Sequence, residues 1–316
     1  MLHATWSASA CGTPVYDSPR DLPEARSGVL TFLRSLPAAA QNSLIIDIGA
    51  SLDPIQPQKN SSAAVLAFEP VMYHHIFHKM KMNERLFISP AAVSASETMM
   101  KMWVLEGYGQ SSSISKPVVP IRKSGVFNAS AAPVHEIDVP VLSLRDILEA
   151  VPPSVELWLV KIDTQGNDFT ALKAAGAALR RAQYVKSEVW LHGQVSYADV
   201  DNDFCADHLP LMTKRGFELQ TLVHEDTPWT PLARGKHEAK VYCTNEDRSQ
   251  QGNPGGFKDK RGRRHEANAF WRRSNVTLAI PPLDQQAVHA FSRQCFFWPG
   301  KSREYSNCLN STYMLR

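Results

Sequence analysis

Short apolar runs separated by small polar turns recur along this chain, and several have the character of buried strands. Residues 44–48 (LIIDI) and 63–68 (AAVLAF) are almost entirely apolar, and residues 157–162 and 184–191 repeat the pattern. Parallel strands that are covered on both faces show such continuous runs, because neither face meets water. The pattern predicts an α/β fold built around a mostly parallel sheet.

Between these runs, apolar residues recur at helical spacing. Residues 22–36 have this spacing and stop before Pro37, and residues 169–179 follow the third apolar run in the same way. Residues 205–215 are amphipathic and end at Gly216, which suits the end of a helix. Residues 217–223 and 239–243 are then predicted as the final strands, joined as an antiparallel hairpin at one edge of the sheet.

Polar residues follow the predicted strands where each strand ends. Gly49 closes the first run, Glu69 the second and Asp163 the third, while Glu188 and His192 lie at the end of the fourth. Parallel α/β sheets bind ligands at the carboxyl ends of their strands, and an acid after the second strand can accept hydrogen bonds from both hydroxyls of a ribose. We therefore expect a cofactor that contains a nucleoside. The G-x-G-x-x-G of dinucleotide-binding dehydrogenases is missing.

Composition excludes few classes of protein. The chain has 316 residues, 43% of them hydrophobic and 21% charged, with a formal charge of +3, which makes no general case for nucleic-acid binding. No apolar run is as long as a membrane span, and the N-terminus lacks the pattern of a secretory signal. We expect a cytoplasmic protein whose oligomeric state the sequence does not indicate.

The cysteines and histidines predict no metal site. Five cysteines, an odd number without a C-x-x-C, indicate neither a metal cluster nor a disulfide framework. Cys295 and Cys308 could pair, although a reduced pair is the expectation for a cytosolic protein. His74 and His78 could share a helix face, but without a nearby acid or cysteine an amphipathic helix is the expected reading.

Three regions follow from the changes in composition. Residues 1–24 are predicted to be an N-terminal extension, and residues 25–245 the main domain. Residues 246–316 begin with a basic loop, whose core is residues 258–264, and continue into an aromatic segment that we expect to pack on the domain. The basic run could bind nucleic acid, but a solvated loop is the expected interpretation, because few aromatic residues accompany it.

Five phrases, DIGAS, LAFEP, SPAAVS, VPVLSLRDIL and LVKIDTQGNDFTALKAAGAAL, occur in the order found in the FkbM-type S-adenosylmethionine-dependent methyltransferases, which residues 40–245 resemble. The resemblance implies the class I methyltransferase (Rossmann-like) fold, with a seven-stranded, mostly parallel sheet and an antiparallel last strand. It also implies methyl transfer, usually to a hydroxyl oxygen of a sugar or a similar small or conjugated acceptor.

The resemblance also implies roles for single residues. Asp47, Gly49 and Ala50 match the motif beneath the methionine part of the cofactor, Glu69 the ribose acid, Ala91 and Ala92 the adenine segment, and Asp163 and Gln165 the phrase near the methyl group. Ser51 and Pro70 adjoin these motifs and complete the expected cofactor site. Residues 51–54 depart from the family, which has Asn and a second Gly there, and Asp168 stands where the family usually has Glu.

Methyl transfer to an alcohol benefits from a base, and three residues are candidates for it: Asp163, Glu188 and His192. A methyltransferase-like binding protein without catalysis is an alternative, motivated by the unusual turn at residues 51–54. A nucleic-acid methyltransferase is a weaker alternative, which rests on the basic run.

Overall fold

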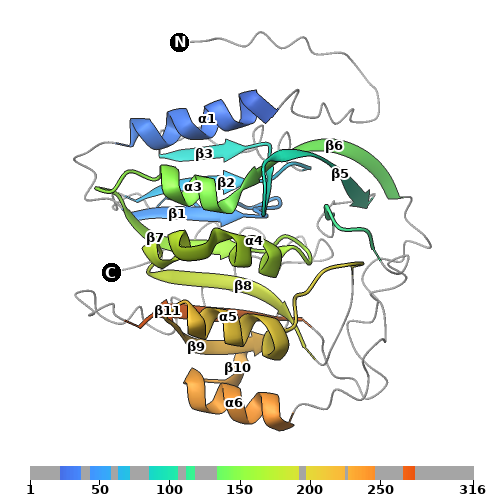
Figure 1. Ribbon diagram of the computed structural model, residues 1–316, viewed down its shortest axis with the longest axis vertical. Helices are drawn as coiled ribbons and strands as arrows, with labels where there is room; N and C mark the ends of the chain where they lie inside the picture. Colours follow the sequence, from blue (N-terminus) through green and yellow to red (C-terminus); the bar gives the residue numbers. More distant parts are fainter. Residues whose placement is uncertain are drawn as a thin grey trace, which may run out of the picture.

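The computed structural model describes residues 22–36, 43–57, 63–71, 85–105, 112–117, 134–191, 197–224, 227–245 and 266–274. Within these ranges a large sheet forms the centre of the molecule (Figure 1). Its strands, in spatial order, are β10 (Thr227–Ala233), β9 (Phe217–His224), β11 (Glu266–Arg273), β8 (Tyr184–Trp190), β7 (Glu156–Ile162), β1 (Ser43–Ile48), β2 (Ala64–Phe68) and β3 (Leu86–Ser89).

The four predicted apolar runs are confirmed as strands β1, β2, β7 and β8. Together with β3 they form five neighbouring parallel strands. Beyond β8 the sheet becomes antiparallel, because β11 runs opposite to both β8 and β9, and β10 runs opposite to β9. The prediction of an antiparallel last strand therefore holds for β11. The predicted count of seven is wrong for the described chain, whose central sheet has eight strands.

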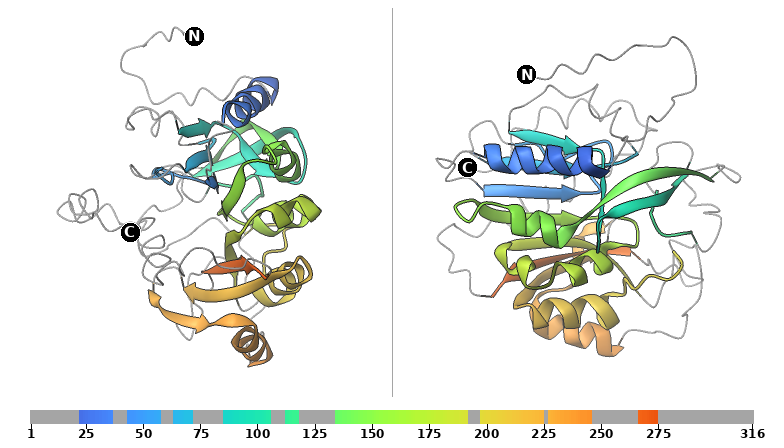
Figure 2. Two further views of the ribbon diagram at one scale, coloured as in Figure 1. Left: turned by 90° about the vertical axis from the view of Figure 1, so that its left-hand side faces the viewer. Right: turned by 45° about the horizontal axis from the view of Figure 1, so that its top comes forward.

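The helices cover one face of this sheet (Figure 2). They are α1 (Leu22–Ser35), α3 (Leu144–Ala150), α4 (Asp168–Ala175) with the 3-10 turn η1 (Gly176–Arg181), the π-helical turn η2 (Phe204–His208) with α5 (Leu209–Lys214), and α6 (Gly235–Asn245). Alternate residues of β1 (Leu44, Ile46 and Ile48) join the core beneath the helices, whereas Ile45 and Asp47 point to the opposite face. The period of two in the strands thus decides which side chains meet the helices.

A smaller sheet extends past the edge where the parallel strands end, which we call the carboxyl edge (Figure 1). It consists of β4 (Ala92–Ser94), β6 (Val134–Ser143) and β5 (Thr98–Leu105), in this order. Buried residues of β5 and β6 form a separate apolar cluster with Val71 and Ile114, whereas Val93 and Leu142 join the main core. At its end Ser143 caps α3, since its Oγ accepts a hydrogen bond from the Asp146 N–H at 3.3 Å.

The prediction for the final hairpin is partly wrong. Residues 217–223 do lie in β9, but residues 239–243 belong to helix α6, and the partner of β9 in the edge hairpin is β10. Ala239 is the buried residue of α6 and packs in the helix-side core. The partly buried Tyr242 and Cys243 of α6 pack against the same core. The short apolar stretch in the sequence does not distinguish this helix from a strand.

Strand β11 shows that residues 266–273, which lie after the predicted domain boundary at 245, are part of the central sheet. Seven of its residues pair with β8 on one side, and a similar number pair with β9 on the other. Its apolar side chains Ala267, Ala269 and Trp271 are buried in the helix-side core. The aromatic residues Phe270 and Trp271 therefore pack as part of a strand. The basic run 258–264 and residues 275–316 lie outside the described residues.

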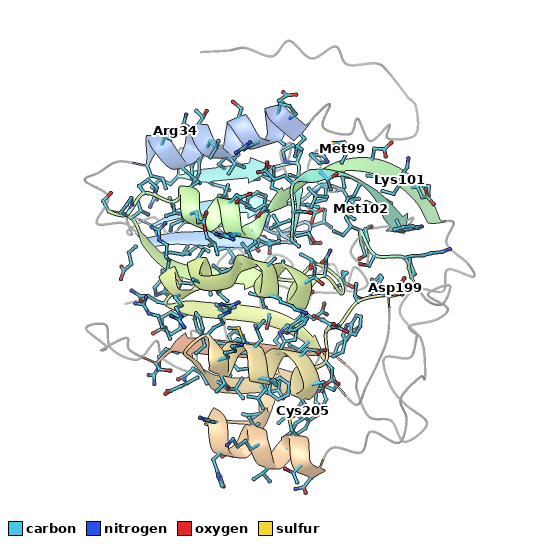
Figure 3. All side chains as sticks on the ribbon, viewed as in Figure 1. Arg34, Met99, Lys101, Met102, Asp199 and Cys205 are labelled. Atoms are coloured by element: carbon cyan, nitrogen blue, oxygen red, sulfur yellow. A yellow bond between two sulfur atoms is a disulfide. The ribbon has the colours of Figure 1, made fainter. Side chains whose placement is uncertain are left out.

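The expectation of no disulfide is wrong for two of the five cysteines. Cys205 in η2, labelled in Figure 3, is bonded to Cys243 in α6, with an S–S distance of 2.01 Å. The bond joins two helical elements that are 38 residues apart and ties α6 to the rest of the domain. Cys11, Cys295 and Cys308 lie outside the described residues. No helix in the described ranges is long and apolar enough to cross a membrane.

Reduction of this disulfide should lower the free energy of unfolding by about 2–4 kcal/mol, because the cross-link restricts the unfolded chain. The test compares urea unfolding of the wild type with that of the Cys205→Ser/Cys243→Ser variant, each with and without dithiothreitol. The free energy of unfolding of the wild type should fall when dithiothreitol is present. That of the variant should be the same with and without dithiothreitol. Equal stability of the oxidised wild type and the variant would contradict the prediction.

Candidate active site

A turn at Gly49 joins the ends of three parallel strands. The N–H groups of Gly49 and Ala50 both donate to the Phe68 carbonyl at the end of β2, at 3.0 and 3.1 Å. The Asp163 N–H, just after β7, donates to the Ile48 carbonyl at 3.1 Å. Gly49 has a φ of +70°, and a Cβ placed on it would lie 1.7 Å from the Asp163 carbonyl oxygen. Only glycine fits between these strands in this conformation.

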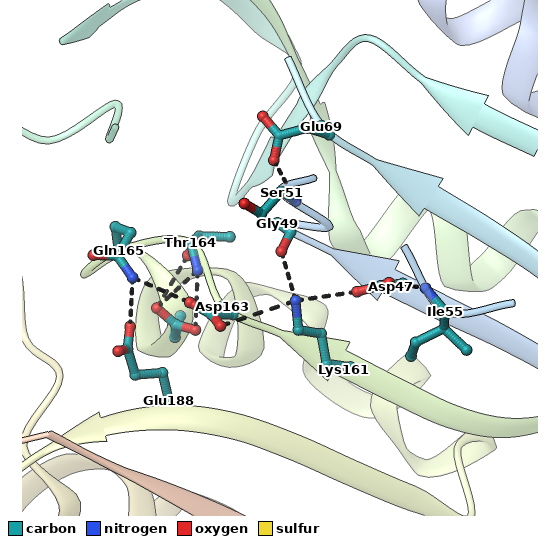
Figure 4. Close-up of polar contacts among 11 residues, drawn as sticks. Asp47, Gly49, Ser51, Ile55, Glu69, Lys161, Asp163, Thr164, Gln165 and Glu188 are labelled. Atoms are coloured by element: carbon teal, nitrogen blue, oxygen red, sulfur yellow. Dashed lines mark hydrogen bonds and ion pairs between the residues drawn. The ribbon is translucent and has the colours of Figure 1, made fainter. Parts of the chain in front are cut away.

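Lys161 is a buried residue at the carboxyl edge that the sequence analysis did not single out. It lies near the end of β7, and its Nζ is 3.1 Å from Asp47 Oδ1 and 3.9 Å from Asp163 Oδ2 (Figure 4). The same ammonium donates to the Gly49 carbonyl at 2.5 Å. Asp47 in turn accepts from the Ile55 N–H at 2.8 Å. One buried cation thus connects the acids after β1 and β7 with the glycine turn. The K of the K-x-D phrase was the available signal.

Glu69 lies at the end of β2 and is held by backbone groups on both sides of it. Its Oε2 accepts from the Ser51 N–H at 2.8 Å, and its Oε1 accepts from the Val71 N–H at 2.9 Å. Ser51 adopts a left-handed conformation, with a φ of 52°. This conformation costs about 1–2 kcal/mol for a non-glycine residue. The unusual turn therefore keeps a glycine-like shape and uses it to fix Glu69.

Gln165 connects two carboxylates at the carboxyl edge. Its amide Nε2 donates to Asp163 Oδ1 at 3.2 Å and to Glu188 Oε2 at 3.1 Å (Figure 4), while its Oε1 accepts from the Tyr197 hydroxyl at 3.3 Å. Gln165 also has a positive φ, of 54°. Strained backbone of this kind is often retained where the surrounding structure holds a functional side chain in place. Three residues expected at the site, Asp163, Gln165 and Glu188, are thus brought together.

Asp168 is completely buried at the start of α4. Its carboxylate accepts from both the N–H and the hydroxyl of Thr164. Burial first, and the charge of Asp163 second, raise the pKa of Asp168 to about 7. The hydrogen bonds from the N–H and the hydroxyl of Thr164 stabilise the charged form of Asp168, which burial disfavours. Through these bonds Asp168 holds the start of the loop that carries Asp163 and Gln165.

The remaining predicted residues divide into three groups. Ala50 is buried beside the glycine turn, and Pro70 is half-buried next to Glu69. Ala91 is buried in the helix-side core, and Ala92 begins β4 with a half-buried side chain. His192, His74 and His78 lie outside the described residues. Within the described ranges no group of three or more His, Cys, Asp or Glu residues is arranged to hold a metal ion.

A histidine that the sequence analysis did not consider, His208, is fully buried behind the site. Its Nε2 is 2.9 Å from Asn202 Oδ1, which also accepts from the Phe169 N–H at 3.2 Å. Burial lowers the pKa of His208 to about 3, so the ring is neutral and Nε2–H donates to the asparagine. This network fixes α4 against η2 and has a structural role.

Comparison with known proteins agrees with this geometry. The model of the methyltransferase FkbM domain matches residues 47–219, more than half of the chain and the whole region from the first acid to strand β9. This chain belongs to the FkbM methyltransferase family. A crystal structure of methyltransferase FkbM from Methylobacillus flagellatus KT is similar, with 13% identity and a TM-score of 0.29. The similarity covers 47% of this chain and 33% of that one, so this chain matches about a third of the length of its relative. No curated protein matches the sequence.

Proposed function

We propose that this FkbM-family methyltransferase takes its methyl group from S-adenosylmethionine and transfers it to a hydroxyl oxygen of a sugar or a similar small acceptor. The observation that carries the proposal is the position of Glu69. Its carboxylate stands at the end of β2, beside the glycine turn, and two backbone N–H groups fix both of its oxygens. A fixed carboxylate in this position suits the two hydroxyls of a ribose.

The charges at the carboxyl edge fit this cofactor better than a phosphate-bearing one. The carboxylates of Glu69, Asp163 and Glu188 lie at the described strand ends, and the ammonium of Lys161 is already paired with Asp47. A sulfonium cation is attracted to such an edge, whereas the phosphates of a dinucleotide would be repelled. The turn also has one glycine where a phosphate-binding loop has several.

When bound, S-adenosylmethionine supplies an electrophilic methyl group on its sulfonium. The residues of the chain then have to hold the acceptor oxygen in line with that methyl group and to receive the hydroxyl proton. The Asp163–Gln165–Glu188 network supplies rigid groups beside the expected position of the methyl group. The acidic edge favours a neutral acceptor over an anionic one, so neutral sugars are the first substrates to test.

Calorimetry with S-adenosylhomocysteine should show binding to the wild type, and Glu69→Gln should lower the affinity by about 10- to 100-fold, because charge-assisted hydrogen bonds contribute about 1.5–3 kcal/mol each. Glu149→Gln is the matched control. Glu149 is an exposed acid on α3 whose ion pair with Arg145 lies on the surface, so its replacement should leave the affinity unchanged.

Absence of binding to the folded wild type at high micromolar concentration would overturn the proposed cofactor. Binding without methyl transfer to methyl α-glucoside, α-mannoside, α-rhamnoside or β-galactoside would favour the alternative of a binding protein without catalysis.

A further inference from the structure

Glu266 lies at the carboxyl edge, although it comes from a part of the chain that the family model does not match. It is the first residue of β11, and the register pairs it with Trp190, the last residue of β8. Since β11 runs antiparallel to β8, its first residue lies where the parallel strands end. The family match stops at residue 219. Sequence reasoning missed this acid because the strand that carries it was not predicted.

The register also indicates the direction of the Glu266 side chain. Asn268 pairs directly with Glu188, so these two side chains lie on the same face of the sheet. Glu266 is two residues before Asn268 and therefore shares that face. His224 pairs with Ala267 and so lies on the opposite face. Glu266 and Glu188 thus flank the same end of the sheet as Asp163.

The acids at this edge differ in how their carboxylates are occupied. Asp163 accepts from Gln165 and faces Lys161, and Glu188 accepts from Gln165 as well. Asp168 is fully buried and bonded to Thr164. Glu266 is partly buried and accepts no hydrogen bond from any residue in the described ranges. Of these four carboxylates, that of Glu266 is the one that no hydrogen bond from a described residue engages.

We propose that Glu266 is the proton acceptor for the acceptor hydroxyl, an inference that rests on the methyl transfer proposed above. As the O–CH3 bond forms and the S–CH3 bond breaks, the hydroxyl proton passes to the Glu266 carboxylate, and the sulfonium leaves as a neutral thioether. Asp163 and Glu188 then have the role of positioning residues, held by Lys161 and Gln165. Strand β11 thereby supplies to this chain a group that the matched family region does not contain.

The electrostatic surroundings of Glu266 suit this role. Burial first, and the charge of Asp163 second, raise the pKa of Glu266 to about 7. Other titratable groups of the edge include Asp168 from α4, Glu188 from β8, Glu69 after β2 and Lys161 of β7. Burial first, and the charge of Glu266 second, raise the pKa of the Tyr197 phenol. A base is most effective when its pKa lies near the working pH.

The raised pKa also has a consequence for stability. The unfolded chain ionises this glutamate near its ordinary pKa of 4.5, whereas the folded protein keeps the proton until pH about 7. Between these values the folded state binds more protons than the unfolded state, so the contribution of Glu266 to stability falls as the pH rises. Glu266→Gln should remove this loss and leave the variant at least as stable as the wild type at pH 8.

The test measures methyl transfer from S-adenosylmethionine to methyl α-glucoside, α-mannoside, α-rhamnoside and β-galactoside across pH 5–9. For the wild type, kcat/KM should rise with an apparent pKa of about 7. Glu266→Gln should lower kcat/KM about 100-fold or more and remove that rise, while binding S-adenosylhomocysteine with unchanged affinity. Glu266→Asp should keep the pH dependence at a reduced rate. The control is Glu218→Gln, which removes an exposed acid of β9 that faces Arg272 at 3.6 Å and should change nothing.

A second measurement does not depend on the loaded enzyme. The protein is labelled with 13C at the glutamate carboxyl carbons and studied by NMR as a function of pH. The signal that is present in the wild type and missing from the Glu266→Gln variant belongs to Glu266, and its chemical shift should titrate with a midpoint near pH 7. A midpoint near 4.5, or a Glu266→Gln variant with wild-type turnover and pH profile, would overturn the role of Glu266 and leave the proposed function intact. A folded wild type that binds no S-adenosylhomocysteine, or transfers no methyl group to these glycosides, would overturn both the role of Glu266 and the proposed function.

Discussion

Gly49→Ala should lose detectable affinity for S-adenosylhomocysteine and lower the free energy of unfolding by about 2–5 kcal/mol. The new Cβ would lie 1.7 Å from the carbonyl oxygen of Asp163, which is backbone and cannot rotate away. Relief requires β1 and β7 to separate, and this breaks the hydrogen bond from the Asp163 N–H to the Ile48 carbonyl. The same movement shifts the carboxylate of Asp163. Urea unfolding and calorimetry measure the two effects.

Gly176→Ala is the matched control for this prediction. Gly176 also has a positive φ, of +60°, but nothing lies within 4 Å of the position that its Cβ would occupy. The variant should bear only the backbone cost of its unusual φ and ψ, about 1–3 kcal/mol, and should bind normally. The prediction is wrong if Gly49→Ala is no less stable than Gly176→Ala and keeps its affinity.

Lys161→Met should lower the free energy of unfolding by about 3–5 kcal/mol, because it leaves a buried carboxylate without its cation. Asp47 is 1% exposed and lies 3.1 Å from the Lys161 ammonium. The substitution also removes the hydrogen bond to the Gly49 carbonyl, so the glycine turn should loosen and cofactor affinity should fall. Adding Asp47→Asn should restore part of the lost stability, since the uncompensated charge is then gone.

Lys101→Met provides the comparison at the surface. Lys101, on β5 (Figure 3), pairs with Asp138 at 3.0 Å, almost the same distance as in the buried pair, but both side chains are more than half exposed. The loss of this pair should cost no more than about 1 kcal/mol. Equal costs for Lys101→Met and Lys161→Met, or a double variant no more stable than Lys161→Met, would contradict the role assigned to Lys161.

The strands and their polar ends could be predicted because both follow from local pattern. A parallel strand buried on two faces is expected to be a largely apolar run, and β1, β2 and β7 are such runs, whereas β8 carries Lys186, Ser187 and Glu188 in its middle. The residue after each run then has to lie at the carboxyl edge. This reasoning placed Glu69, Asp163 and Glu188 at one edge, and the structure joins Asp163 to Glu188 through Gln165.

The errors occurred where burial depends on partners far away in the sequence. Residues 239–243 resemble a strand, but they form part of α6, which β9 and the Cys205–Cys243 bond hold in place. Strand β11 contains charged and polar residues at both ends, so its sequence does not show the continuous apolar run of the parallel strands. It forms a strand because its backbone pairs with β8 on one side and with β9 on the other, and both partners are distant in the sequence.

The sequence by itself determined the α/β class, the parallel strands and the acids at their ends, because the alternation of apolar and polar residues reports directly which positions are buried. The tertiary structure alone decided which charges face each other. The pairing of Lys161 with Asp47, the confinement of Gly49 by the Asp163 carbonyl, and the pairing of Glu266 on β11 with the end of β8 all join residues separated by more than seventy positions. Such contacts depend on strand order and register, and a linear pattern of hydrophobicity contains neither.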